Sequence, residues 1–315
     1  MAKHTPPPPL GADPHTGRFD ATFPTEPPSL HIARRVGQGT NRLVHADNLA
    51  LLRTLPDESI DLIYADPPFA TGQRRRTAQN TATFGDPRPT DLAHYLGWLN
   101  ARLFEMYRTL APSGTLYLHL DWHIVHHVKI QLDTLFGGAA HFRNEIVWHY
   151  NSGPRRPNDF GRRHDLILRY AKTAHCFFDP DAVRQPYSPD IHIPPSKRHY
   201  YHPNGKVMDD VWRIPIIPQN DKTERLGYPT QKPEALLDII IRASSAPGQL
   251  VADLFCGSGT TLVVAAKRGR RWLGCDTNPD AIAIAATRLE GLGLLGGGFI
   301  LEEPSPAESD DRDNR

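Results

Sequence analysis

Short apolar runs alternate with helical patterns along most of the chain, and this alternation is the feature that most constrains the fold. Six runs have the length and composition of buried strands, at residues 42–46, 60–64, 115–120, 145–150, 249–254 and 271–275. Helical patterns follow at residues 48–55, 91–110, 123–136, from 233 onward, 260–267 and 279–289. Strands that alternate with helices predict an α/β fold built on a parallel sheet.

The alternation is interrupted between residues 141 and 232, where the pattern becomes that of loops and short strands. This segment carries 15 Lys and Arg against ten Asp and Glu, together with seven His. The last 15 residues are acidic, with six Asp and Glu against two Arg. The formal net charge of +1 for the 315-residue chain therefore hides a basic segment, and near-neutrality does not exclude a nucleic-acid partner.

Composition and spacing exclude several other classes of protein. The sequence has no run of 18 apolar residues that would predict a membrane helix, and its first residues lack the apolar segment of a secretory signal. Cys176, Cys256 and Cys275 form no CxxC pair, which argues against disulfides and structural zinc and fits a reducing cytoplasm. His123 and His127 share a helix face, but no third ligand has a recognisable spacing, so no metal site is predicted.

A glycine-rich turn lies where the strand at 249–254 leads into a helix, and it reads Asp253-Leu254-Phe255-Cys256-Gly257-Ser258-Gly259-Thr260-Thr261. Its glycines allow positive φ and close approach of a ligand, and the free N–H groups of the helix suit a carboxylate or phosphate. No Gly-Lys-Ser/Thr follows, which excludes a P-loop, and the dinucleotide fingerprint lacks its third glycine. Asp276 closes the next strand, as a ribose-binding acid does. A plain strand–helix turn, with Asp276 as a helix cap, remains the alternative.

A second motif, Asp66-Pro67-Pro68-Phe69, follows the strand at 60–64. A Pro-Pro step donates no backbone hydrogen bonds and holds a stiff turn, which fixes the direction of the Asp66 and Pro67 carbonyl oxygens. A carboxylate, a carbonyl and an aromatic ring at the carboxyl end of a parallel strand suit a planar ring with an exocyclic amine. The ring would stack on Phe69 and the amine would donate to Asp66 and Pro67. An ordinary proline turn with a capping Asp is the alternative.

Together the two motifs resemble those of the DNA amino-methyltransferases, which carry an Asp/Asn/Ser-Pro-Pro-aromatic catalytic motif and a Phe-x-Gly-x-Gly cofactor motif. Supporting stretches span most of residues 42–290, among them Phe142-Arg143-Asn144-Glu145-Ile146-Val147-Trp148 and Tyr228-Pro229-Thr230-Gln231-Lys232-Pro233. The order of catalytic motif, basic segment and cofactor motif resembles the β class, shared with type II and type III modification enzymes. The resemblance implies a circularly permuted, Rossmann-like sheet of an S-adenosylmethionine-dependent methyltransferase, with an inserted target-recognition region.

The resemblance also implies roles for individual residues. It assigns catalysis and contact with the target base to Asp66, Pro67, Pro68 and Phe69. It assigns binding of the cofactor, S-adenosyl-L-methionine, to Asp47, Thr230, Lys232, Asp253, Phe255, Gly257, Gly259 and Asp276. Within that set Asp47 would contact the adenine ring and Asp276 the ribose hydroxyls. Thr230 and Lys232 would border the methionine carboxylate, and the other four would hold the methionine part.

The implied function is site-specific methyl transfer to the N6 amine of an adenine flipped out of double-stranded DNA. Asp at the head of the motif favours adenine over the N4 amine of cytosine, because N4 enzymes commonly carry Ser there. An RNA or protein-amide methyltransferase and a catalytically idle DNA-binding modification subunit are further alternatives. The basic segment favours DNA, and the intact Asp66 and Phe69 argue against an idle subunit.

The resemblance extends to partners, location and domain organisation. It suggests a homodimer and a restriction endonuclease as partners, no membrane, and a cytoplasmic protein associated with the nucleoid. Five parts are expected along the chain: a disordered proline-rich arm (1–30), a catalytic half (31–150), a target-recognition region (151–226), a cofactor-binding half (227–295) and a disordered acidic tail (296–315).

Overall fold

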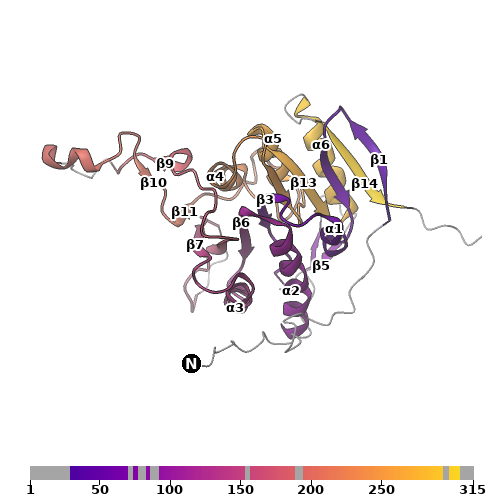
Figure 1. The fold of residues 1–315 in the computed structure, drawn as a ribbon, viewed down its shortest axis with the longest axis horizontal. Helices are drawn as coiled ribbons and strands as arrows, with labels where there is room; N and C mark the ends of the chain where they lie inside the picture. The colour runs from indigo at the N-terminus through magenta and orange to yellow at the C-terminus, as the bar shows by residue number, and fades with distance from the viewer. Residues whose placement is uncertain are drawn as a thin grey trace, which may run out of the picture.

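The structure is a computed structural model that describes residues 29–69, 74–76, 83–85, 92–152, 157–188, 194–293 and 298–305. Within this part of the chain, ten strands form one sheet in the order β1-β14-β2-β13-β12-β3-β6-β8-β7-β11 (Figure 1). Their bounds are β1 Leu30–Val36, β2 Asn41–His45, β3 Ile60–Ala65, β6 Leu110–Leu120, β7 Phe142–His149, β8 His164–Ala171, β11 Val211–Arg213, β12 Leu250–Asp253, β13 Arg271–Asp276 and β14 Phe299–Pro304. Two small ribbons lie apart from it, β4 (Arg74–Arg76) with β5 (Thr83–Gly85) and β9 (Arg184–Gln185) with β10 (Lys206–Val207).

The centre of the sheet is parallel, as the alternating pattern predicts. Neighbouring strands from β14 through β2, β13, β12 and β3 to β6 all pair in parallel. Antiparallel pairs occur toward both edges, where β1 pairs with β14 and β8 lies between β6 and β7. β12 and β3 are direct neighbours, so the strand before the glycine turn lies beside the strand before the Pro-Pro motif.

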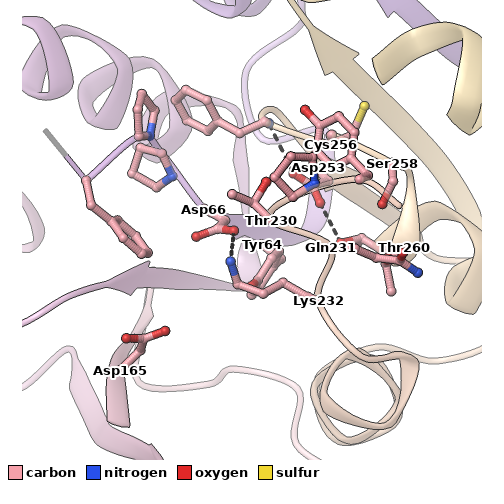
Figure 2. Close-up of a pocket in the computed structure, with 18 of the residues that line it drawn as sticks. Tyr64, Asp66, Asp165, Thr230, Gln231, Lys232, Asp253, Cys256, Ser258 and Thr260 are labelled. Atoms are coloured by element: carbon pink, nitrogen blue, oxygen red, sulfur yellow. Dashed lines mark hydrogen bonds and ion pairs between the residues drawn. The ribbon is translucent and has the colours of Figure 1, made fainter. Parts of the chain in front are cut away.

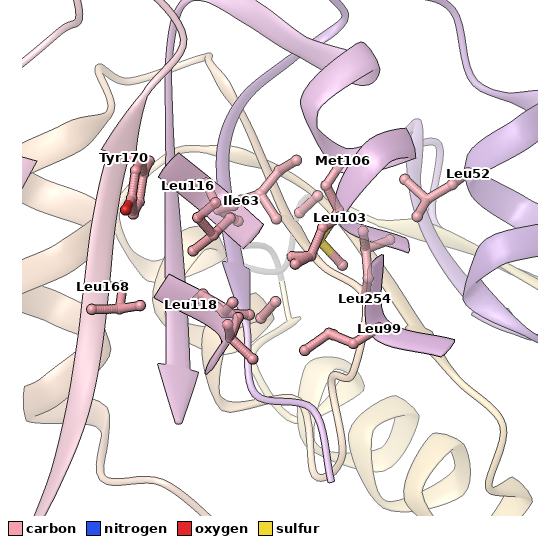
Figure 3. Packing of buried hydrophobic residues seen from close by; sticks show 14 of the residues in the cluster. Leu52, Ile63, Leu99, Leu103, Met106, Leu116, Leu118, Leu168, Tyr170 and Leu254 are labelled. Atoms are coloured by element: carbon pink, nitrogen blue, oxygen red, sulfur yellow. The ribbon is translucent and has the colours of Figure 1, made fainter. Parts of the chain in front are cut away.

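Helices cover both faces of the sheet and make an α/β/α sandwich (Figure 1). The helices are α1 Asn48–Thr54, α2 Leu92–Thr109, α3 Val125–Phe136, α4 Glu234–Ser244, α5 Thr260–Lys267 and α6 Pro279–Glu290, with 3-10 turns η1 Asp181–Val183 and η2 Pro195–Tyr200. Side chains alternate across each strand, so Ile63 packs under α2 with Leu103 and Met106, whereas Leu62 packs under α4 and α5 (Figure 3). The two buried clusters fix the sheet from both sides.

The expected elements are confirmed with modest shifts of their ends. β6 begins at Leu110 rather than at residue 115, because α2 passes directly into the strand. The strand β8 is an element that the sequence pattern did not reveal. It lies within the expected target-recognition region (151–226), yet it pairs with β6 and β7 in the central sheet. The boundary expected at residue 151 is therefore wrong as an end of the sheet, since Leu166, Ile167 and Leu168 are buried in its core.

The acidic tail expected to be disordered from residue 296 is wrong for residues 299–304, which form β14. Phe299 and Leu301 are buried, and the Phe299 ring centroid lies 5.5 Å from that of Trp272. Burial of these two side chains in an otherwise polar sequence supplies the free energy that holds the strand. Residues 306–315 lie outside the described residues, as do residues 1–28 of the expected arm.

Among the described residues, no helix combines the length and the hydropathy that crossing a membrane would require.

Candidate active site

The two motifs meet in one cavity of about 870 Å³ at the carboxyl ends of β3 and β12 (Figure 2). In the sheet register Asp253 pairs with Tyr64, so the residues that follow each strand emerge side by side. Eleven of the twelve predicted site residues line this cavity: Asp47, Asp66, Pro67, Pro68, Phe69, Thr230, Lys232, Asp253, Phe255, Gly257 and Asp276. Gly259 is the predicted residue that is absent from its lining.

The Asp253 carboxylate organises the glycine turn from inside. Its Oδ1 accepts the backbone N–H of Phe255 at 3.1 Å, and its Oδ2 accepts the hydroxyl of Thr261 at 2.5 Å. The side chain is 3% exposed, so these two bonds satisfy a charge that water hardly reaches. Asp253 therefore joins the end of β12 to the first turn of α5.

The two glycines of the turn serve different purposes. Gly257 has φ +48°, and a Cβ there would come within 3.2 Å of the Tyr228 ring. Its N–H donates to Asp276 Oδ2 at 2.8 Å, which ties the turn to the end of β13. Gly259 has φ +76°, and a Cβ there would lie 2.8 Å from Cβ of Ala285 on α6. Gly259 is thus required for helix packing, and its expected contact with the cofactor remains a prediction.

A buried arginine that the sequence did not single out holds the opposite end of the cavity. Arg102 of α2 donates to Asp47 Oδ2 at 2.6 Å and to Asn48 Oδ1 at 2.7 Å, while Asn48 donates to the Leu254 carbonyl at 2.6 Å. Asp47 Oδ1 also caps α1. The signal for Arg102 was a charge within the apolar pattern of α2, which is equally typical of a surface position.

The Asp66-Pro67-Pro68-Phe69 motif leaves β3 and turns along the cavity wall. The hydroxyl of Tyr95 donates to the Pro68 carbonyl at 2.9 Å and fixes the turn to α2. The Asp66 carboxylate faces the cavity, where its Oδ2 is paired with the ammonium of Lys232 (Figure 2). Its Oδ1 lies 4.0 Å from Nδ1 of His119, beyond hydrogen-bond distance. One carboxylate oxygen of Asp66 is thus available to a substrate.

The partner of Lys232 is an unexpected feature of the site. The resemblance implied that Lys232 borders the methionine carboxylate, whereas here its ammonium binds Asp66. The same ammonium lies 5.7 Å from the centroid of the Phe69 ring. Lys232 lies two residues before α4, so the segment that leads into this helix connects the glycine turn to the Pro-Pro motif. Its contact with the cofactor remains a prediction.

A buried hydrogen-bonded chain behind Asp66 was also missed by sequence reasoning. Tyr64 Oη and Nδ1 of His119 are 2.8 Å apart, and Nε2 of His119 lies 3.2 Å from Oδ2 of Asp165. The hydroxyl of Tyr150 donates to Asp165 Oδ1 at 3.1 Å. Burial alone would raise the pKa of Asp165, but the hydrogen bond and charge of His119 leave that pKa below its usual value. His119 comes from β6 and Asp165 from β8, so the chain could not be inferred without knowing that these strands pair.

The remaining histidine contacts in this region involve carboxylates. His123 Nδ1 makes a short contact with Asp121, whose Oδ1 also accepts the His123 N–H at 3.0 Å. In the described part of the chain, no three His, Cys, Asp or Glu side chains are grouped as metal ligands.

Burial raises the pKa of the Asp253 carboxyl to about 7, against the opposing hydrogen bonds from Thr261 and Phe255. A carboxyl whose pKa is higher in the folded than in the unfolded state stabilises the fold at low pH. That contribution is lost as pH rises through the folded pKa. We therefore expect unfolding of the unliganded protein to become easier between pH 4 and 8, with Asp253 accounting for up to about 4 kcal/mol.

The variant Asp253→Asn isolates this effect because an amide keeps the shape and does not titrate. Urea unfolding at pH 5 and pH 8 should show a smaller loss of stability in the variant than in the parent. Asp276, whose pKa burial also raises, stays in both proteins and cancels from the comparison. Parallel stability curves for the two proteins would contradict the assignment to Asp253.

Comparisons with known proteins decide the family. The model of the DNA methylase family of N6 and N4 methyltransferases matches residues 60–287. This chain belongs to that family. It is 32% identical over 265 residues to the DNA adenine methyltransferase YhdJ of Escherichia coli (strain K12), covering 81% of this chain and 85% of the relative. It is also 32% identical over 253 residues to the type II methyltransferase M.HpaI of Haemophilus parainfluenzae, covering 79% and 74%.

Solved structures of the DNA methylase fold agree with the architecture. The cytosine-N4-specific PvuII DNA methyltransferase superposes with a TM-score of 0.59 at 19% identity, covering 84% of this chain and 95% of that one. A DNA modification methylase of Thermus thermophilus, complexed with S-adenosyl-L-methionine, gives 0.55 at 22% identity, covering 86% and 100%. The Rossmann-like methyltransferase fold is thus confirmed, and this methylase is an S-adenosylmethionine-dependent DNA N-methyltransferase.

The cavity suits that cofactor on the evidence of its own side chains. Carboxylates of Asp66, Asp253 and Asp276 line it, and these complement a cofactor that carries a sulfonium and an ammonium group. The rings of Phe255 and Trp98 lie 5.9 Å apart on its wall and offer an apolar surface to the adenine moiety. The residues present therefore fit S-adenosyl-L-methionine.

Proposed function

We propose that this methylase transfers a methyl group from S-adenosyl-L-methionine to the N6 amine of a specific adenine flipped out of double-stranded DNA. The observation that carries the proposal is the location of Asp66 and Pro67 beside the glycine turn, in the same cavity. Asp66 Oδ1 and the Pro67 carbonyl are hydrogen-bond acceptors, and an exocyclic amine has two N–H groups to donate. The site therefore matches an amine in number and kind of hydrogen bonds.

The proposed roles follow from the chemistry of that amine. When bound, the cofactor supplies a methyl group on a sulfonium, whose leaving group needs no acid. The amine is a poor nucleophile because its lone pair is delocalised into the base. Acceptance of both N–H hydrogens by Asp66 and Pro67 localises the lone pair and directs it at the methyl group. Phe69 stacks on the flipped base, and Asp66 takes up the proton that the methylated amine loses.

Adenine is favoured over cytosine by the residue at the head of the motif. Asp66 stands where cytosine-N4 enzymes commonly carry Ser. The relative YhdJ, which matches most of this chain, is named a DNA adenine methyltransferase. The cytosine-N4-specific PvuII enzyme matches in fold at 19% identity, which says nothing of the base. Methylation of N4 of cytosine is the alternative that the experiment below must separate.

The expected target-recognition region is proposed to read the DNA sequence, although part of it belongs to the sheet. The segment with β9, η2 and β10 projects from the body of the molecule (Figure 1). η2 has no buried residue, and its last turn carries Lys197, Arg198 and His199. An exposed basic projection on the chain that also forms the base cavity supports contact with the phosphates and base edges of a duplex.

Partners beyond the DNA substrate are part of the same proposal. Relatives of this chain are named type II methyltransferases, among them M.HpaI, M.ScaI and M.BglII. These names support a role in restriction–modification with an endonuclease partner. We also propose a homodimer and a cytoplasmic enzyme that associates with the nucleoid through its substrate.

The chemical identity of the product tests this proposal. We expect DNA incubated with the protein and methyl-labelled cofactor to yield labelled N6-methyladenine on nuclease digestion and mass analysis of the nucleosides. The expected label in N4-methylcytosine is below about one hundredth of that amount, since each base must fit the same pocket. Label only in N4-methylcytosine would reverse the choice of base. Label in neither nucleoside would contradict amino-methylation of DNA by this chain.

A further inference from the structure

Phe160 is the most exposed large apolar side chain that the structure describes, with 93% of its surface accessible. It lies in the loop that joins β7 to β8, just before Arg162 and Arg163. A fully exposed phenyl ring gains nothing from the fold, because its apolar surface stays in water. Such a residue next to arginines suggests contact with a partner that offers both apolar and anionic groups.

The loop around Phe160 is held in place by a chain of contacts. Asp159 Oδ1 accepts the Phe160 N–H at 2.9 Å, and Asp159 Oδ2 accepts from the Arg162 guanidinium at 3.1 Å. That guanidinium lies 4.0 Å from the centroid of the Trp122 ring. Trp122 in turn stacks on His123, with ring centroids 3.7 Å apart. Phe160 is therefore presented by a supported turn.

This supported turn stands at the rim of the base cavity. Trp122, His123, Arg162 and His164 line the same cavity as Asp66. Phe160 is two residues from Arg162, which in an extended chain corresponds to roughly 7 Å. The exposed ring thus lies just outside the opening through which a flipped base would enter.

We propose that Phe160 is a wedge that enters the base stack of the duplex at the position vacated by the target base. This inference rests on the proposed function. Extruding a base leaves a gap in the stack and an unpaired partner base, and an inserted aromatic ring restores stacking with the neighbouring bases. Arg162 and Arg163 supply positive charge for the phosphates that flank the gap. Trp122, which supports Arg162, is a positioning residue in this arrangement.

The test compares Phe160→Ala with the parent enzyme on two duplexes. Both carry the sequence found methylated in DNA of a host that expresses the chain. In one the target base is normally paired, and in the other it lies opposite an abasic site, where flipping needs little help. We expect Phe160→Ala to lower kcat/KM about thirtyfold on the paired duplex and less than about threefold on the abasic one.

Two further variants make the result specific to the wedge. Phe160→Leu keeps an apolar side chain that can fill part of the gap, so it should recover most of the activity on the paired duplex. Ile32→Ala removes an exposed apolar side chain from β1, at the far edge of the sheet, and should change activity on neither substrate. With 2-aminopurine at the target position, the parent should raise the fluorescence on binding and Phe160→Ala should raise it less.

An equal loss on both duplexes, or no loss on either, would overturn the wedge. Failure of the proposed function has a different signature, because the parent enzyme would then transfer no methyl group to an amine on either duplex.

Discussion

Asp66→Ala is expected to lower the rate of methyl transfer by about a thousandfold or more while S-adenosyl-L-methionine binds within about threefold of its normal affinity. The carboxylate lies at the end of β3, where its Oδ1 is open to the cavity and its Oδ2 pairs with Lys232. Removing it takes away the acceptor proposed to localise the lone pair of the amine. The cofactor turn, held by Asp253 and Asp276, keeps all of its own hydrogen bonds.

Single-turnover transfer and calorimetric titration with the cofactor separate these two effects. Asp66→Asn keeps an oxygen acceptor and should fall between the parent and the alanine variant. Asp57→Ala, which removes an exposed carboxylate between α1 and β3, is the matched control and should leave both quantities unchanged. Near-normal turnover in Asp66→Ala would mean that the Pro-Pro motif does not hold the reacting amine.

The sheet was predictable because its signal is local and repeated. Alternating side chains such as Leu62 and Ile63 pack against opposite helix layers, and runs of this kind dictate buried strands wherever they occur. β8 escaped because its apolar run stands in a basic, proline-rich segment and carries Arg169 within it. Arg169 is buried, with its guanidinium 4.5 Å from the ring centroid of Phe178, a pairing that no local pattern announces.

The candidate site was predictable only where a motif concentrates it in a few consecutive residues. The Pro-Pro motif and the glycine turn are local sequences, and the pairing of β3 with β12 brings them into one cavity. His119 and Asp165 come from separate strands, and each alone is typical of an ordinary polar position. Arg102 is similar, since its meeting with Asp47 depends on the packing of α2 beside α1. Such residues become visible through tertiary structure, because the chemistry lies in their juxtaposition.

Lys232→Met is expected to lower kcat by about a hundredfold while the Kd of S-adenosyl-L-methionine changes by less than about threefold. The ammonium of Lys232 binds Asp66 Oδ2 and lies beside the Phe69 ring, so it fixes the direction of the other carboxylate oxygen. Without it the carboxylate can rotate away from the position that meets the amine. A misplacement of about 1 Å is enough for a loss of this size.

The same variant distinguishes two roles for Lys232 that predict opposite kinetic signatures. If Lys232 chiefly borders the methionine carboxylate, as the family resemblance implies, Kd for the cofactor should rise at least about tenfold with kcat nearly unchanged. If it orients Asp66, kcat should fall, and Lys232→Arg, which keeps the charge, should recover part of the loss. Lys267→Met is the matched control, because Lys267 is an exposed lysine that pairs with Glu234 on the surface. A change in Kd alone would therefore assign Lys232 to the cofactor and leave the orientation of Asp66 to the stiffness of the Pro-Pro turn.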